Sequence, residues 1–230
     1  MEPVLMCWSG GKDSALALAE ALADPALRVE ALLTTVTEQY ERISMHGVRR
    51  ELLTEQAEIL GLPLEEVRIP VRASNEIYEA NMRRLLIRYQ ARGVQRVIFG
   101  DLFLQDIRAY RERQLATLGM RGLFPLWLKN TRALAQEFIA RGFRAILVCI
   151  DPKQLDPSFC GREFDEQLLR DLPPGADPCG ENGEFHTFVY EAPIFRRPIP
   201  VARGEIVCRD GFWFCDLTRC HGIPPDGSPA

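Results

Sequence analysis

The stretch that decides the fold lies near the start of the chain and reads Cys7-Trp8-Ser9-Gly10-Gly11-Lys12-Asp13-Ser14. An apolar run, residues 4–8, leads into it, and a run of strong helix formers, residues 15–20, leads out. This order predicts a strand, a tight loop and a helix start. The paired glycines let the backbone turn sharply and leave no side chain between its amides and an anion. The stretch therefore predicts an anion site at the positive end of a helix.

The spacing separates this loop from two commoner nucleotide motifs, because it matches neither G-x-x-x-x-G-K-[ST] nor G-x-G-x-x-G. Ser-Gly-Gly-x-Asp-Ser instead resembles the pyrophosphate loop of the N-type ATP pyrophosphatases. Those enzymes split ATP into AMP and pyrophosphate while they adenylate a carbonyl or carboxylate oxygen. A glycine turn with an ordinary helix cap is the alternative. Lys12 is one of three lysines in the chain, and its compact charge suits a phosphate.

Composition narrows the class of protein. The chain has 230 residues, of which 47% are hydrophobic and 26% charged, as expected for a globular protein of one or one and a half domains. The net charge is −4 and arginines alternate with acids, so a nucleic-acid partner is not favoured. We expect a cytoplasmic protein, with neither a membrane span nor a signal peptide. Seven scattered cysteines argue against a secreted disulfide framework.

Strands and helices alternate along the first 150 residues. Strands are predicted at 29–36, 64–69, 96–99 and 143–150, with a short edge strand or turn at 123–127. Helices are predicted at 48–60, 74–93, 104–118 and 131–141. This alternation predicts an α/β fold, a Rossmann-like doubly wound parallel sheet of the pyrophosphate-loop ATPase type. Ligands bind such sheets beyond the strand C-termini at the switch point, where residues 9–14 and Gly100-Asp101 both fall.

The character of the sequence changes after Asp151. A short acidic helix at 161–172 precedes a Pro/Gly-rich linker or lid at 173–180, and a hairpin with a turn at 210–211 follows. We expect a nucleotide-binding domain over 1–151, a smaller α+β substrate-binding lobe over 152–222, and a loose tail over 223–230.

Downstream motifs narrow the resemblance. Gly100-Asp101, the segments 108–113 and 119–127, and Gly183-Glu184 resemble, in this order, the diphthine–ammonia ligase family over residues 1 to about 190. In that family the enzyme adenylates the diphthine carboxylate on elongation factor two, and ammonia then displaces AMP. The resemblance implies ATP and magnesium as cofactors. It implies that Glu184 lies on the acceptor side and that Gly100 and Asp101 line the nucleotide and substrate cleft. The residues that it implies for the ATP phosphates are Ser9, Gly10, Gly11, Lys12, Asp13 and Ser14.

Two segments depart from the family pattern. Where diphthamide-making members carry a Glu-Gly-Gly-Glu-Tyr-Glu-Thr type of segment, this chain has Glu181-Asn182-Gly183-Glu184-Phe185-His186-Thr187. The segment 44–49 also differs. Both resemble a bacterial branch associated with cobalamin salvage or another amidation. The acceptor therefore stays open: diphthine, a corrinoid-related molecule, or another small-molecule or protein carboxylate.

Individual residues have a chemical and a structural interpretation. We expect Lys12 to bridge the leaving phosphates and Asp13 to hold magnesium, directly or through water, unless Asp13 is only a helix-start acid. Asp101 would hold the ribose or magnesium, or else cap a loop. Glu184, with Lys12 and Asp13, completes the predicted catalytic set and could handle the proton of the incoming amine. The substrate contacts that we expect, each with a plain surface role as its alternative, are His46, Arg108, Arg111, Glu181 and His186.

Three functions follow as hypotheses. The first is an AMP-forming amide ligase supplied by free ammonia or a partner, because no glutaminase domain is visible. The second is a tRNA-modifying enzyme of the thiolation type on the same loop. The third is an ATP-binding protein without turnover. A homodimer stays open as the assembly.

Overall fold

A parallel sheet is built around the strand that leads into the loop. The computed structural model describes residues 1–37, 39, 42–43, 47–71 and 74–220. From one edge to the other, the parallel strands are β4 (Leu64–Ile69), β2 (Leu27–Thr37), β1 (Glu2–Cys7), β5 (Arg96–Ile98) and β6 (Arg121–Leu123). A two-residue strand, β3 (Arg42–Ile43), pairs antiparallel with the end of β2. The chain order reverses direction across the sheet between β1 and β5, which makes this the switch point.

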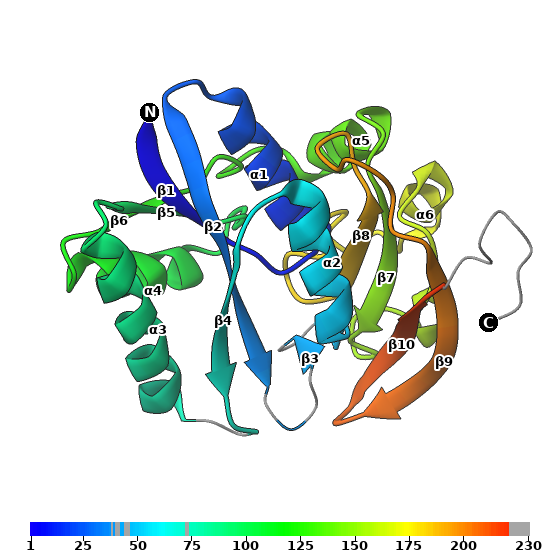
Figure 1. Ribbon diagram of the computed structural model, residues 1–230. Helices are drawn as coiled ribbons and strands as arrows, with labels where there is room; N and C mark the ends of the chain where they lie inside the picture. Colours follow the sequence, from blue (N-terminus) through cyan, green and yellow to red (C-terminus); the bar gives the residue numbers. More distant parts are fainter. Residues whose placement is uncertain (38, 40–41, 44–46, 72–73, 221–230) are drawn as a thin grey trace, which may run out of the picture.

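Helices cover both faces of this sheet (Figure 1). Those on one face are α1 (Lys12–Ala23) and α2 (Arg50–Leu60), and those on the other are α3 (Asn75–Gln90) and α4 (Gln105–Ala116). Side chains of a strand alternate between faces, so Met6 joins the cluster under α1 and α2 while Leu5 joins the one under α3 and α4. The predicted Rossmann-like doubly wound fold is confirmed.

A second, antiparallel sheet follows in the C-terminal half. Its strands, in order, are β8 (Phe185–Glu191), β7 (Arg144–Ile150), β10 (Phe212–Arg219) and β9 (Val201–Arg209). The helices of this half are α5 (Thr131–Ala140), a 3-10 turn at Pro157–Phe159, and α6 (Glu166–Asp171). This sheet packs on the α1 and α2 side of the first one, since one hydrophobic cluster contains residues of β1, α1, β7 and β8 (Figure 1).

The placement of β7 corrects the sequence analysis. Residues 143–150 were expected to continue the parallel sheet, but β7 pairs antiparallel with β8 and β10. A continuous apolar run is typical of any strand buried on both faces, whether parallel or antiparallel. The strands that pair with β7 come later in the sequence, so local patterns did not reveal them. The second sheet therefore begins before the predicted boundary at residue 151. The division into domains at that residue stays a prediction, and the tail over 223–230 lies outside the described residues.

Two turns show how local chemistry sets the element ends. The short strand of the 119–127 segment lies at Arg121–Leu123, and residues 125–128 form a turn. Pro125 in this turn has no backbone N–H to donate to a neighbouring strand, so it does not extend the strand. Of the edge strand or turn expected at 123–127, the turn is confirmed over most of the segment, and the strand lies just before it. The hairpin turn at Asp210 and Gly211 is confirmed, with φ of +49° and +86°. Among the described residues, no helix combines the length and apolar character needed to cross a membrane.

Candidate nucleotide site

The loop between β1 and α1 has a fixed shape. Gly10 has φ of +77°, and a Cβ there would lie 2.7 Å from Oε1 of Gln56, so glycine is needed for both conformation and space. The hydroxyls of Ser9 and Ser14 lie 3.2 Å apart, and Ser14 donates to the Gly11 carbonyl at 2.9 Å. The loop therefore holds the first turn of α1 at the end of β1, where residues 11–14 line the pocket described below.

Lys12 is held in a buried position at the start of α1. Its Nζ lies 2.7 Å from Oδ2 of Asp13 and donates to the carbonyl of Cys179. The same atom lies 5.8 Å and 5.5 Å from the ring centroids of Phe164 and Phe185. Burial works to lower the pKa of Lys12, but its acidic neighbours, with Asp13 first among them, together raise it. Lys12 is therefore a permanent positive charge at the anion site.

Asp13 has one oxygen free for a ligand. Oδ2 faces Lys12, whereas Oδ1 is buried without a hydrogen-bond partner. Burial raises the pKa of Asp13 against the effect of the lysine charge. A free carboxylate oxygen at an anion site suits magnesium, which takes one or two carboxylates together with phosphate oxygens and water. The described residues contain no group of three or more side chains that could hold a metal ion. Magnesium at this site would therefore be held by Asp13 together with phosphate oxygens and water.

Gly100 brings the end of β5 against the loop. A Cβ at Gly100 would lie 2.8 Å from the backbone carbon of Asp13, so only glycine permits this approach. The next residue, Asp101, is paired with Arg111 of α4, with 2.8 Å between Oδ2 and Nε. Burial works to lower the pKa of Arg111, but its acidic neighbours raise it. The predicted carboxylate and one predicted arginine thus form an ion pair at the switch point.

Arg108 lies elsewhere, although it is only three residues before Arg111. Its guanidinium lies 4.6 Å from each ring centroid of Phe124 and Trp127, and its Nε donates to Glu112 at 2.8 Å. The structure brings Arg111 to the pocket and leaves Arg108 outside it. His46, the other predicted substrate residue of this half, lies outside the described residues.

The segment before β8 supplies the opposite wall. Oε1 of Glu181 accepts the amides of Leu102 and Phe103 at 2.8 and 3.4 Å, and burial raises the pKa of Glu181 to about 7. Burial, with help from the Lys12 charge, lowers the pKa of His186 to about 4. Both side chains line the pocket, so at neutral pH it holds an uncharged imidazole and a half-protonated carboxyl.

Glu184 is turned into the protein. Its Oε1 accepts the amide of Asp177 at 2.7 Å and the side-chain amide of Asn182 at 3.1 Å, and its Oε2 is buried with no hydrogen-bond partner. It is 2% exposed and is absent from the pocket wall, so in this arrangement it shapes the turn that carries Glu181.

These side chains surround one pocket of about 500 Å³, a size suited to a nucleotide. The loop and residues 99–101, directly after β5, line one side, residues of the segment 179–187 other than Glu184 line another, and Arg111 comes from α4. The remaining lining residues that sequence reasoning did not single out include Cys7, Thr34, Thr35, Ile69, Tyr78 and Thr187. Thr34 is 3% exposed, and its hydroxyl is buried without a hydrogen-bond partner, so it offers a free polar group to a ligand.

Gln56 joins the loop to the second sheet and was missed. Its side-chain amide donates to the carbonyls of Gly10 and Val189 at 3.1 and 2.6 Å, and its oxygen accepts the indole N–H of Trp8 at 2.9 Å. Beside it, the hydroxyl of Thr187 accepts the amide of Lys12 at 3.0 Å. The signal was present in the sequence: position 56 falls on the apolar stripe of its helix, where a polar residue needs partners.

Comparison with known proteins places this architecture in a family. A family model described as the diphthamide synthase N-terminal domain matches residues 2–122, and one described as the C-terminal domain matches residues 130–223. The chain belongs to the diphthamide synthase family. The resemblance expected from the motifs is confirmed.

Proteins named diphthine–ammonia ligase are similar along the chain. It is 25% identical to that of Mus musculus, over 96% of this chain and 95% of that protein. It is 31% identical to that of Bos taurus, over 50% of this chain and 45% of that protein. The match to that of Schizosaccharomyces pombe is 25% identical and covers 98% of this chain but 41% of that protein. The chain thus spans under half of the bovine and yeast relatives and nearly all of the mouse one.

Proposed function

We propose that this protein is an ATP-dependent carbon–nitrogen ligase. It adenylates a carboxylate with release of pyrophosphate, and ammonia then displaces AMP to leave an amide. The observation that carries the proposal is the shared pocket, in which a pyrophosphate-type loop and the Glu181–Thr187 segment face each other at the switch point. The names of the similar proteins, diphthine–ammonia ligase, are those of a reaction of this type.

The loop supplies the chemistry of the leaving group. The amides at the start of α1 and the charge of Lys12 would stabilise the phosphates as negative charge develops on pyrophosphate. Asp13 would hold magnesium through its free Oδ1, and the ion would neutralise the phosphate oxygens. Arg111, already oriented by Asp101, lies where it could bind the acceptor carboxylate in bidentate fashion.

The opposite wall supplies the groups for the second step. Ammonia must lose a proton after it attacks the acyl adenylate. Glu181 lines the pocket and has a pKa of about 7, so its carboxylate form is available to take that proton at neutral pH. His186 stays uncharged at this pH and presents polar ring nitrogens without adding charge.

Thiolation chemistry is not favoured by the two cysteines in this pocket, Cys7 and Cys179, because burial raises the pKa of each thiol. Cys179 lines the pocket, but burial raises its pKa to about 12, above the range in which a thiolate nucleophile forms readily. Its thiol donates to the carbonyl of Thr131 at 3.3 Å, which fits a structural role.

Phosphorus NMR with magnesium ATP, ammonium and candidate carboxylates tests the proposal. Diphthine-bearing elongation factor two and a small-molecule extract serve as separate acceptor pools. AMP and pyrophosphate should form, and Lys12→Ala and Asp13→Asn should abolish them. Lys153→Ala, which removes an exposed lysine, is the matched control and should retain full activity. Formation of ADP and phosphate would refute the chemistry, and efficient turnover with glutamine in place of ammonium would refute the nitrogen source.

A further inference from the structure

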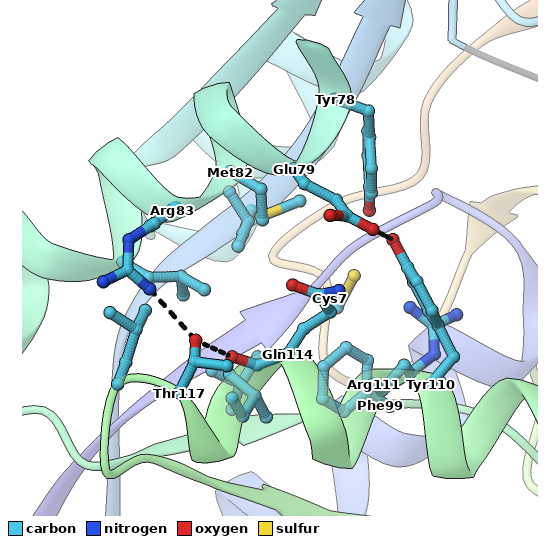
Figure 2. A pocket seen from close by; sticks show the side chains of 15 residues that line it. Cys7, Tyr78, Glu79, Met82, Arg83, Phe99, Tyr110, Arg111, Gln114 and Thr117 are labelled. Atoms are coloured by element: carbon cyan, nitrogen blue, oxygen red, sulfur yellow. Dashed lines mark hydrogen bonds between the residues drawn. The ribbon is translucent and has the colours of Figure 1, made fainter. Parts of the chain in front are cut away.

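A smaller cavity adjoins the nucleotide pocket between α3 and α4 (Figure 2). Its volume is about 60 Å³, several times what one water molecule needs. The residues that line both cavities are Cys7, Leu33, Tyr78, Phe99 and Arg111. The smaller cavity therefore meets the nucleotide pocket at one end.

The other end of the cavity reaches the protein surface. Arg83 of α3 and Thr117, directly after α4, belong to its lining, and both are exposed. The Arg83 guanidinium donates to the Thr117 hydroxyl at 3.0 Å, so a hydrogen bond joins the two helices at this rim. In Figure 2 this pair and Arg111 lie on opposite sides of the cavity. The cavity thus forms a passage from the surface to the nucleotide pocket, separate from the pocket's own mouth.

The walls between the two ends are mostly apolar. Among the described residues that line the passage, Glu79 is the one acid, and it accepts the hydroxyl of Tyr110 at 2.9 Å (Figure 2). Burial of an unpaired charge between apolar walls costs far more than burial of a neutral molecule. The passage therefore favours a small neutral molecule over a cation. The apolar residues of these walls are Leu33, Met82, Leu86, Val97, Leu115 and Leu118.

The charges of the lining act in the same direction. Each end of the passage carries a guanidinium, that of Arg83 at the surface and that of Arg111 at the nucleotide pocket. A cation on its way to the pocket is repelled by both, whereas a neutral molecule is not. Glu79 lies between them and offers its carboxylate as an acceptor for N–H groups (Figure 2). A small neutral N–H donor matches this lining.

We infer that this passage delivers neutral ammonia to the acyl adenylate. Ammonia is about as large as a water molecule, has N–H groups for Glu79 and carries no charge. Ammonium leaves its proton in the water outside, and the nitrogen of ammonia attacks the acyl carbon. The bond from that carbon to AMP breaks as the new carbon–nitrogen bond forms, and the surplus proton on nitrogen passes to Glu181.

This inference rests on the proposed function, because it gives the nitrogen donor its route. ATP and an acceptor would fill the nucleotide pocket through its own mouth. Ammonia reacts after both have formed the acyl adenylate, so it needs a second way in. The α3–α4 passage supplies one that opens on the end of β1, beside Cys7, and on Arg111.

Tryptophan substitutions on the two helices test the route. Met82→Trp on α3 and Gln114→Trp on α4 place an indole in the lining, and the cavity is too small to hold an indole and stay open. The matched controls are Ala80→Trp and Ala116→Trp, which add an indole at exposed positions of the same helices outside the lining. All four variants are assayed with magnesium ATP and the acceptor pool that gives AMP with the wild type.

Two assays separate the steps of the reaction. Exchange of pyrophosphate into ATP without ammonium reports adenylation, and amide formation at varied ammonium reports the second step. Both lining variants should keep the exchange rate and raise the KM for ammonium about tenfold, since only the second step uses the passage. They should also form more AMP per amide, because water then competes for the acyl adenylate. The controls should match the wild type in all three readouts.

Two results would overturn the inference. An unchanged KM for ammonium in either lining variant would show that ammonia enters through the mouth of the nucleotide pocket. A loss of exchange in step with the loss of amide would show a general disturbance of the site instead of a blocked route. Failure of the proposed function is distinct, because the wild type itself would then form no AMP, and the inference would fall with it.

Discussion

Replacing Gln56 by leucine should separate the loop from the second sheet. The side chain is fully buried, and its three hydrogen bonds join Gly10 of the loop, Val189 of β8 and the indole of Trp8. Leucine has a similar volume, so the change removes hydrogen bonds more than packing. The Gly10 carbonyl keeps the amide of Val189 as a donor at 2.9 Å, whereas the indole N–H of Trp8 loses its acceptor.

The expected cost is worked from the groups left without partners. A buried donor without an acceptor costs about 1–3 kcal/mol, and each of the two other hydrogen bonds about 1 kcal/mol, so Gln56→Leu should lower the free energy of unfolding by about 3–5 kcal/mol. Because the loop is no longer held against β8, binding of ATP should also weaken. The matched control is Gln167→Leu, which removes an exposed bond to Asp171 and should cost under about 0.5 kcal/mol.

Urea unfolding measures the first effect and titration calorimetry with ATP measures the second. In a Trp8→Phe background the indole N–H is absent, so the cost of Gln56→Leu should fall by about 1–2 kcal/mol. The reasoning would be refuted if Gln56→Leu lowered the free energy of unfolding by no more than the control does. It would also be refuted if the decrease caused by Gln56→Leu were unchanged in the Trp8→Phe background.

Three further predictions follow from the site and its surroundings. Gly100→Ala should abolish ATP binding in calorimetry, because the added Cβ would lie 2.8 Å from the backbone of Asp13; Gly175→Ala, with open space around it, should bind normally. The pKa of His186 is about 6.5 in the unfolded chain and about 4 in the folded protein, so between these pH values the unfolded state binds more protons and the free energy of unfolding should fall as the pH drops. The urea midpoints of the wild type and His186→Asn should therefore converge in acid, and a gap that stays constant with pH would contradict this. Leu128 is 67% exposed with φ of +59°, so Leu128→Gly should raise the free energy of unfolding by about 0.5–1 kcal/mol in urea melts, and a loss would contradict the strain argument.

Local patterns were enough for the fold class and for the loop. The glycine pair, the apolar run before it and the helix formers after it are contiguous, so they identify the turn and the anion site without long-range information. The alternation of strands and helices then implies a doubly wound sheet, and its switch point places Gly100 and Asp101 beside the loop. These expectations depend on backbone periodicity and on glycine conformation, which neighbouring residues determine.

The tertiary structure alone decided which polar side chains meet. Arg108 and Arg111 share a helix, but aromatic rings hold the first and Asp101 draws the second to the pocket. Glu181 and Glu184 lie in one segment, yet one faces the pocket and the other supports the turn behind it.

The sheet that receives β7 was also undetermined by the sequence alone. An apolar run indicates that a strand is buried but not which strand it pairs with. The partners of β7 are β8 and β10, which come from distant, later segments of the chain. The amino-acid sequence by itself thus determined the nucleotide loop and the parallel sheet that carries it. Packing between distant segments determined the opposite wall of the pocket, the role of Gln56 and the cavity beside Glu79, because contacts of that kind depend on shape and charge brought together in space.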